Sequence, residues 1–330
     1  MAYRYLVGAI ATLTLVVANG NTGAQPGRQD VAAAYPGRPI RMIVPVPPGG
    51  SSDGMARILG QKLTESWSQQ VLVDNRAGAA EVIGTEIVAR ANPDGYTMGL
   101  MSLRYSVNPS LLKLPYDTVK DFAPITMTAA VGNVLVVNVK SPHATVKDLI
   151  AAAKQKPGEL TFASSGLGGA PHLIGEFFAL TTGIKMTHIA YKGGGPAISD
   201  LLGGNVSMSF ASMTSSLQFV KAGRLRALAV SSKERSAQLS DVPTMAEAGV
   251  PNIVVRDWQG LVAPRGTPKA IIDKLAGETR RILRDPANQE RFATLGLDII
   301  ASTPEEFGAA IKSEIERWAK VVKEANIKAE

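Results

Sequence analysis

The stretch VPVPPGGSSDGMAR, residues 44–57, joins an apolar strand to the start of a helix through a turn of Pro and Gly. The apolar segment PIRMIVPV at 39–46 leads into the turn, and Met55 begins a series of apolar residues at helical spacing. A strand, a Gly-rich turn and a helix in this order are the unit of α/β folds. The stretch also contains G-x-S-x-G, the pattern of the hydrolase nucleophile elbow, with Ser52 at its centre. Ser52 is therefore either a nucleophile or part of a turn that holds a ligand.

The alternation of strand and helix patterns continues along the chain. Further strands are expected at 71–75, 96–101, 132–139, 160–164, 187–191, 206–210 and 225–231. Helices are expected near 82–91, 145–153, 171–180, 196–202 and 214–222. Three more are expected where a capping residue precedes Pro, at Thr267-Pro268, Asp285-Pro286 and Thr303-Pro304. This order predicts an α/β fold of mostly parallel sheets flanked by helices.

The composition of the 330-residue chain indicates an exported, folded protein, with 45% apolar and 19% charged residues. Residues 1–24 place one Arg before an apolar run at 5–18, which is typical of a signal peptide cut near residues 18–24. This run is shorter than the roughly 20 residues that span a bilayer. The chain has no Cys, which excludes disulfides and a lipid-modified Cys. We therefore expect a mature protein free in its compartment, with residues 25–35 as a linker.

The charge pattern favours small anionic ligands over large partners. The net charge is +7, but Lys and Arg are scattered and only 5% of residues are aromatic, so no nucleic-acid partner is expected. No Cys is present and no two His have ligand spacing, so no metal is expected. No phosphate-binding loop of the G-x-x-x-x-G-K-[ST] type is present, and no cofactor is expected.

The histidines weigh against the hydrolase alternative. Hydrolases of the elbow type place the catalytic His after the nucleophile, usually close to the chain end. The three His residues of this chain are His143, His172 and His188, and none lies beyond residue 188. The chain also lacks an HGGG-type oxyanion motif. Catalysis by Ser52 remains the alternative to a binding function.

Three turns share one design, in which a strand ends, small residues expose backbone N–H groups and a helix begins. They are PPGGSSD at 47–53, SSGLGGAPH at 164–172 and YKGGGPA at 191–197. The first N–H groups of a helix lack partners and the helix dipole favours negative charge, so such turns bind anions. An ordinary tight turn remains the alternative for each one alone. Together, the three turns predict a shared cleft that holds a carboxylate.

These turns resemble those of the Bug-type (TctC-like) substrate-binding proteins of tripartite tricarboxylate transporters. Five blocks carry the resemblance, namely YPGRPIRMIVPVPPGGSSD, NPSLLKLPYDTVKDFAPI, SSGLGGAPHLIGEFF, YKGGGPAISDLLGGNV and GLVAPRGTP. The resemblance implies a two-domain periplasmic-binding-protein fold of type II, with the ligand cleft between the domains. It also implies a non-enzymatic periplasmic receptor that delivers a mono-, di- or tricarboxylate, aromatic acids included, to membrane permease subunits. We expect a monomer.

The resemblance also implies which residues bind the ligand. Those of the first half are Gly49, Gly50, Ser51, Ser52, Asp53, Ser102 and Tyr105. Those of the second half are Ser164, Ser165, Gly166, Gly168, Gly169, His172, Tyr191, Lys192, Gly193, Gly194, Gly195 and Ser212. Ser207 and Ala211 stand where relatives often have acids, which counts against an amino-acid ligand, because its ammonium needs a carboxylate partner.

Several of these side chains have a plainer alternative role. Asp53 lies in the first turn of its helix and suits the helix dipole as well as a ligand. A lysine in the position of Lys192 is more often a solvated loop charge than a ligand contact, and His172 is also explained as a hydrogen-bond partner of its own turn. Trp258 suits either the core or the cleft.

The expected domain boundaries follow from two candidate crossings between the domains, VLVVNV and VVRDWQGLVAP. Domain 1 is then discontinuous and comprises residues 36–131 and 256–330. Domain 2 comprises residues 132–255. Closure about two crossing strands is the expected motion.

Overall fold

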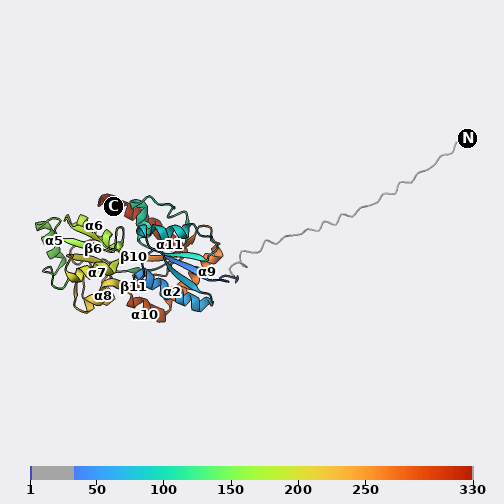
Figure 1. Cartoon of the computed structure of the whole chain (residues 1–330), viewed down its shortest axis with the longest axis horizontal. Coiled ribbons are helices and arrows are strands. Elements are labelled where there is room, and N and C mark those ends of the chain that lie inside the picture. The colour runs from blue at the N-terminus through green and yellow to red at the C-terminus, as the bar shows by residue number, and fades with distance from the viewer. Residues whose placement is uncertain (2–32, 329–330) are drawn as a thin grey trace.

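A computed structural model describes Met1 and residues 33–328 of the chain; the predicted signal peptide and most of the predicted linker lie outside the described residues. Two sheets flanked by helices form two lobes that lie side by side, with α5 to α8 in one and α2, α9 and α11 in the other (Figure 1). The predicted α/β class is confirmed by this arrangement.

The first sheet has the strand order β11-β4-β10-β3-β1-β2. Its strands are β1 (Ile40–Val44), β2 (Val71–Asn75), β3 (Thr97–Ser102), β4 (Phe122–Val131), β10 (Asp257–Pro264) and β11 (Leu297–Ile299). Its helices are α2 (Ser51–Trp67), the short η1 (Ala79–Glu81), α3 (Val82–Ala89), α4 (Arg104–Leu111), α9 (Lys269–Arg284), α10 (Pro286–Thr294) and α11 (Pro304–Glu324). Helix α2 packs against this sheet through Met55, Leu59 and Leu63, which are fully buried at the predicted helical spacing.

The second sheet has the strand order β7-β6-β8-β5-β9. Its strands are β5 (Asn133–Asn138), β6 (Thr161–Ser164), β7 (Thr187–Ala190), β8 (Met208–Ser212) and β9 (Leu225–Val230). Its helices are α5 (Val146–Gln155), α6 (Ala170–Thr182), α7 (Gly194–Gly203), α8 (Met213–Lys221) and the short η2 (Ala237–Leu239).

Two of the three predicted Pro-initiated helices begin as expected. Thr303 accepts a hydrogen bond from the N–H of Glu306 and forms a capping box at the start of α11. Asp285 accepts one from Ala287 at the start of α10. The prediction for Thr267 was wrong, because its hydroxyl donates to the Pro264 carbonyl and α9 begins at Lys269 without a side-chain cap.

The chain passes between the lobes at two places. Strand β4 ends at Val131 and β5 begins at Asn133, so only Gly132 separates a strand of the first sheet from a strand of the second. The return path leads through Val255, whose N–H bonds the Ser231 carbonyl, into β10 at Asp257. The expectation that VLVVNV itself forms a crossing is corrected, because β5 pairs with β8 and β9 throughout its length.

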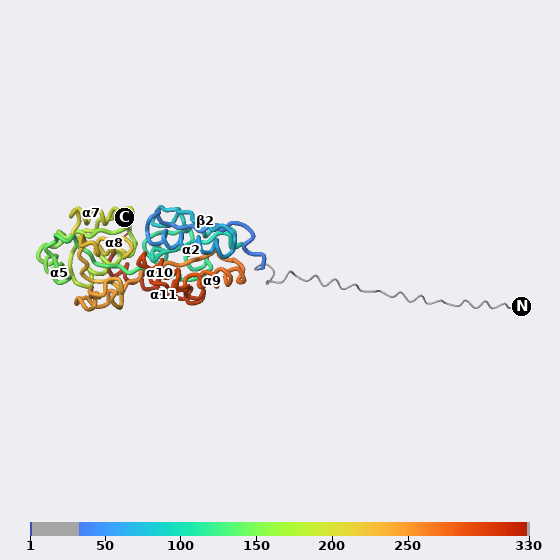
Figure 2. The backbone as a smooth tube through the Cα atoms, turned by 90° about the horizontal axis from the view of Figure 1, so that it is seen from below, coloured from blue at the N-terminus to red at the C-terminus, as the bar shows by residue number. Residues whose placement is uncertain are grey.

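Strand directions explain where the sheets depart from a parallel arrangement. In the first sheet β10 and β11 run against the other strands, and in the second only β5 does. Strands β5 and β10 are those by which the chain enters a lobe from the other one, and they therefore start at the edge where the parallel strands end. Figure 2 shows the consequence, because the blue and red ends of the chain share one lobe while the other lobe runs from green through yellow to orange.

A common apolar core extends from one lobe to the other and includes Trp258, Tyr105 and Phe162. Trp258 is 3% exposed and its ring lies 5.4 Å from that of Phe307, so Trp258 belongs to the core and not to the cleft. Within the described residues, no helix is both long enough and apolar enough to cross a membrane.

Candidate ligand-binding cleft

A cavity of about 930 Å³ lies between the two lobes, and we call it the cleft cavity. The first lobe lines it with residues 45–52 and 77–81, with Ser102 and Arg104 at the end of β3, and with Asp257. The second lobe lines it with segments after β6, β7 and β8. The cavity thus lies at the carboxyl ends of the parallel strands, which is where α/β folds bind ligands.

Helices α3 and α4 begin at the wall of the cleft cavity through Glu81 and Arg104, and four further helices begin there, namely α2, α6, α7 and α8. Their N-cap residues are Gly50, Gly169, Gly193 and Ser212, and none of these side chains makes a capping hydrogen bond. Helices α5, α10 and α11 begin away from the cavity and each has a side-chain cap, whereas α9, which also begins away from it, has none. The helix ends that face the cavity therefore keep N–H donors and a positive dipole end for an anion.

Two glycines hold the cavity turns in a conformation that other residues adopt at a cost. Gly49 has φ 92° and Gly193 has φ 112°, both in the left-handed region. A Cβ atom built on either would meet no protein atom within 4 Å. The requirement for glycine thus comes from the backbone and from the space left for a ligand, not from crowding within the protein.

The structure brings most of the predicted ligand-binding residues together at the cleft cavity. Those that line it are Gly49, Gly50, Ser51, Ser52, Ser102, Ser165, Gly166, Gly169, Lys192, Gly193, Gly194, Gly195 and Ser212. They come from both lobes and from all three Gly-rich turns. Their role in binding stays a prediction.

Six predicted residues do not line the cavity, and the first of them is Asp53. Its carboxylate accepts hydrogen bonds from Arg57 Nε at 2.9 Å and from the Gly49 N–H at 3.0 Å. Burial opposes ionisation, but the hydrogen bonds from Arg57 and Gly49 prevail and lower the pKa of Asp53. Asp53 therefore stabilises the first Gly-rich turn from the side away from the cavity. This position corrects the expectation that Asp53 contacts the ligand.

The two tyrosines are also corrected, because both point away from the cavity. Tyr105 is 2% exposed and its hydroxyl donates to the Thr118 carbonyl at 2.5 Å. Tyr191 donates to Asp200 on α7 at 2.5 Å. The neighbours of these tyrosines, Arg104 and Lys192, line the cavity in their place.

The second Gly-rich turn contains three residues that were expected to contact the ligand but lie on the side away from the cavity. They are Ser164, Gly168 and His172. The Gly168 N–H donates to His172 Nδ1 at 3.1 Å, and Ser164 Oγ lies 2.6 Å from His188 Nε2. The two imidazoles stack at 4.2 Å. Burial lowers the pKa of His172 to about 3 and that of His188 to about 4, so both rings are neutral. No histidine is among the described residues that line the cavity with Ser52, so the elbow pattern lacks its base there.

Three charged residues of the cavity wall were not predicted, and we call them the acid–guanidinium cluster: Glu81, Arg104 and Asp257. Glu81 accepts from Ser102 Oγ at 2.8 Å and lies 3.4 Å from Arg104 Nη1. Glu81 ends η1, where Ala79, Ala80 and Glu81 all have positive φ. Arg104 lies within the stretch from Ser102 to Tyr105 that was expected to contribute ligand contacts, although only Ser102 and Tyr105 were named there.

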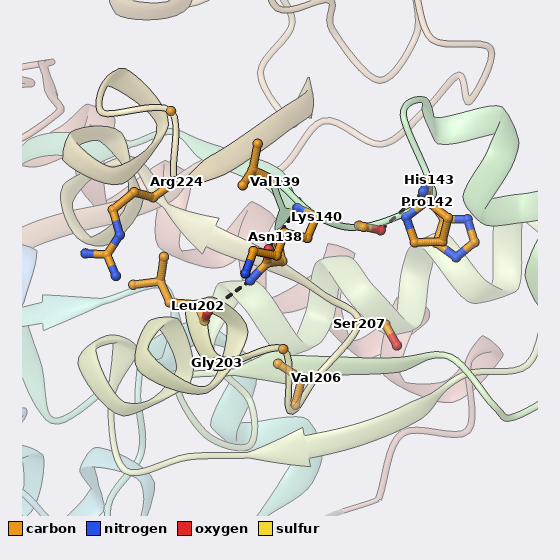
Figure 3. A pocket seen from close by; sticks show the side chains of 13 residues that line it. Asn138, Val139, Lys140, Pro142, His143, Leu202, Gly203, Val206, Ser207 and Arg224 are labelled. Carbon is orange, nitrogen blue, oxygen red and sulfur yellow. Dashed lines mark hydrogen bonds between the residues drawn. The ribbon is translucent and has the colours of Figure 1, made fainter.

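A second hollow of about 580 Å³ lies at the other end of the second sheet, and we call it the outer hollow (Figure 3). Asn138, Lys140, His143, Leu202 and Arg224 are among its lining residues. The Asn138 side chain donates to the Leu201 and Leu202 carbonyls at the end of α7, at 3.1 and 2.9 Å. The outer hollow therefore lies against helix C-termini.

The fold and the cavity are those of a solute receptor, and comparison with known proteins agrees. The family model "Tripartite tricarboxylate transporter family receptor" matches residues 55–327, so the chain belongs to this family. Protein BugT of Bordetella pertussis is 44% identical over 300 residues, which cover 90% of this chain and 92% of the relative.

Two solved structures extend the comparison. The periplasmic binding protein BugD has a TM-score of 0.83 and 36% identity, over 90% of this chain and 100% of that chain. The Rhodopseudomonas palustris protein Rpa4515, solved with adipate, has a TM-score of 0.85 and 34% identity, over 89% of this chain and 99% of that chain. The chain is therefore similar to periplasmic binding proteins, and its family is one of receptors and not of enzymes.

Proposed function

We propose that this protein is an extracytoplasmic receptor that binds a small carboxylate-bearing metabolite in the cleft cavity and delivers it to the permease subunits of a tripartite tricarboxylate transporter. The observation that carries the proposal is the meeting of four helix N-termini without side-chain caps at one cavity between two lobes. Donors of this kind favour an anion without a matching cluster of arginines.

The relatives and the chain itself support this proposal. A similar protein was solved with adipate, a dicarboxylate. Export through the predicted signal peptide would bring the receptor to the periplasm, cut near residues 18–24. The domains would be residues 36–131 with 256–330 and residues 132–255, closing as a monomer about Gly132 and the return path near Val255. The protein performs no catalysis in this role.

The test replaces the carboxylate that the backbone grips. A screen of mono-, di- and aromatic carboxylates by thermal shift first identifies a ligand. Its primary amide should then bind at least about 2 kcal/mol more weakly, because N–H donors would face an N–H₂ group. Isothermal titration calorimetry measures both affinities. Equal affinities for the acid and the amide would refute a grip by backbone donors.

A further inference from the structure

Two of the helices that begin at the cleft cavity have the same hydrogen bond at their entry. In α2 the Gly49 N–H donates to the Asp53 carboxylate at 3.0 Å. In α6 the Gly168 N–H donates to His172 Nδ1 at 3.1 Å. Each donor glycine directly precedes the N-cap residue and has a positive φ, and each acceptor is the third residue of its helix. The two side chains therefore occupy equivalent positions and accept the same hydrogen bond, but one is a carboxylate and the other is an imidazole.

Helices that begin away from the cavity use an acid for this bond. Asp148 is the third residue of α5 and accepts from the Thr145 N–H at 2.9 Å. Glu306 is the third residue of α11 and accepts from the Thr303 N–H at 2.8 Å. The positive end of the helix dipole favours a negative charge in the first turn, which explains these acids. His172 lacks that charge, so the stability of its own helix does not explain it.

The ring of His172 is neutral in this position. An Nδ1 atom that accepts an N–H carries no proton, so the ring holds its one proton on Nε2. Glu176 Oε1 lies 3.8 Å from Nε2, beyond hydrogen-bond distance, and burial raises the pKa of Glu176. Burial lowers the pKa of His172 to about 3, and charge interactions with His188 and Arg104 contribute to this shift. The second Gly-rich turn is therefore held by an uncharged acceptor.

Among the described helices that begin at the cavity, acids at the helix start are found in the first lobe only. Helix α2 has Asp53 in its first turn, paired with Arg57 Nε at 2.9 Å. Helix α3 has Glu81 as its N-cap, paired with Arg104 Nη1 at 3.4 Å. Helices α6, α7 and α8 of the second lobe have no acid in the first turn. The positive potential at these three helix starts is therefore not offset by a carboxylate of the same helix.

We propose that His172 is a positioning residue, which holds the second Gly-rich turn with a neutral acceptor so that no negative charge opposes an anion at the α6 N-terminus. This inference rests on the proposed function, because that anion is the carboxylate of the ligand. His172 does not line the cleft cavity and acts through the turn, whose residues Gly166 and Gly169 do line it. An aspartate at this position would lack the guanidinium that α2 provides, because Glu176 stands where α2 has Arg57.

The experiment exchanges the acceptor at position 172 and measures affinity by calorimetry on the mature chain. The probes are adipate, L-malate, butyrate and benzoate, and one acid that binds is sufficient. His172→Asn keeps a neutral acceptor, because Asn Oδ1 and His Nδ1 are both bonded to Cγ, and should stay within about threefold of the wild type. His172→Asp keeps the acceptor and adds a charge, so it should bind at least about tenfold more weakly than His172→Asn at about pH 8.5.

A second substitution tests whether the charge is the cause. Glu176→Arg added to His172→Asp reproduces the Asp53–Arg57 pair of α2 in α6. It should restore the affinity to within about threefold of His172→Asn, because the guanidinium offsets the carboxylate. No recovery of affinity in this double variant would contradict the electrostatic role of position 172.

His143→Asp provides the matched control, because His143 lies at the outer hollow of the same lobe and the substitution makes the same change of charge. It should change the affinity less than about twofold, since solvent and salt screen a charge at that distance. Equal affinities of His172→Asn and His172→Asp would overturn the inference and leave the carboxylate receptor standing. Binding of none of the four acids by the wild type would count against both.

A measurement on the wild-type protein tests the inference without any variant. NMR of the ring nitrogens should show His172 with an unprotonated Nδ1 at neutral pH, before and after the addition of the acid that binds. A proton on Nδ1 in either state would refute the neutral acceptor. Melting temperatures and circular dichroism identify a variant that fails to fold.

Discussion

The cleft cavity and the outer hollow lie at opposite ends of the same two helices. Residues at the start of α7 and α8 line the cleft cavity, and residues at or just after their ends line the outer hollow (Figure 3). Both hollows contain glycines and lysine. Among the described lining residues, those of the cleft cavity alone also include carboxyl groups and N–H donors that no side chain caps.

The difference teaches how to interpret a basic surface on an α/β protein. Lys140 and Arg224 of the outer hollow are exposed beside helix C-termini, whose carbonyls attract cations. Their charge is therefore explained by the helices themselves. At the cleft cavity the helix ends carry a positive partial charge. The counter-charge for these helix N-termini has to be an anion from outside the protein.

The largest effect expected from this comparison concerns the two caps of α7. Gly193 is the N-cap at the cleft cavity with φ 112°, and Gly204 is the C-cap at the outer hollow with φ 76°. A Cβ on either meets no atom within 4 Å, so Gly193→Val and Gly204→Val should both lower the melting temperature through backbone strain. Only Gly193→Val places a branched side chain in the cavity, and it should weaken the ligand at least about 100-fold, or about 2.7 kcal/mol. Calorimetry measures the ligand affinity of both variants. Equal affinities of the two variants would contradict this prediction.

An effect on stability, and not on binding, is expected when one arginine is removed from each hollow. Arg104→Met takes away the cation beside the buried Glu81 and the contact across the cleft to Gly166, and should lower stability by about 3 kcal/mol. Arg224→Met removes an exposed charge and should stay within about 0.5 kcal/mol of the wild type. Urea unfolding of both variants gives these values. Similar losses of stability in the two variants would show that Arg104 is not coupled to the acids of the acid–guanidinium cluster.

The free energy of unfolding should depend on pH through His172 and His188, which lie behind the wall of the cleft cavity. Burial lowers their pKa values to about 3 and about 4, below the roughly 6.5 of an unfolded chain. As the pH falls from 6.5 to 4, the unfolded state binds more protons and the free energy of unfolding decreases. Calorimetric melting should therefore show a steeper decline for the wild type than for the His172→Gln/His188→Gln variant. Parallel curves would mean that the rings are protonated in the folded protein.

The smallest effect is expected at the serine that first suggested an enzyme. Ser52 lines the cleft cavity, so Ser52→Ala should cost the ligand at most one hydrogen bond, about 1 kcal/mol. Ser207→Ala at the outer hollow should leave affinity unchanged. Calorimetry measures both, beside an esterase assay of the wild type. Ester turnover that depends on Ser52 would establish the hydrolase alternative.

Local patterns predicted much of the fold but not all of it. Strand β2 lies at the predicted residues 71–75, α6 begins one residue earlier and ends two residues later than predicted, and α8 lies one residue earlier than predicted. Strand β4 was not predicted, since FAPITMTAAV contains Pro and does not alternate. Helix α4 was missed for a similar reason, because Pro109 lies inside it. The burial of both elements is decided by neighbours distant in sequence.

The sequence by itself determined the α/β class, the three Gly-rich turns and the family. The reason is that periodicity, glycine positions and helix starts each depend on residues within a few positions of one another. Tertiary structure alone decided which side of each turn faces the cavity, and so placed Arg104 and Lys192 there while their neighbours Tyr105 and Tyr191 point away. It also brought Glu81 and Asp257 to one wall from segments 176 residues apart, counted as 257 minus 81. No local sequence pattern predicts that Glu81 and Asp257 come together, because their proximity depends on how the chain crosses between two lobes and packs them against a common core.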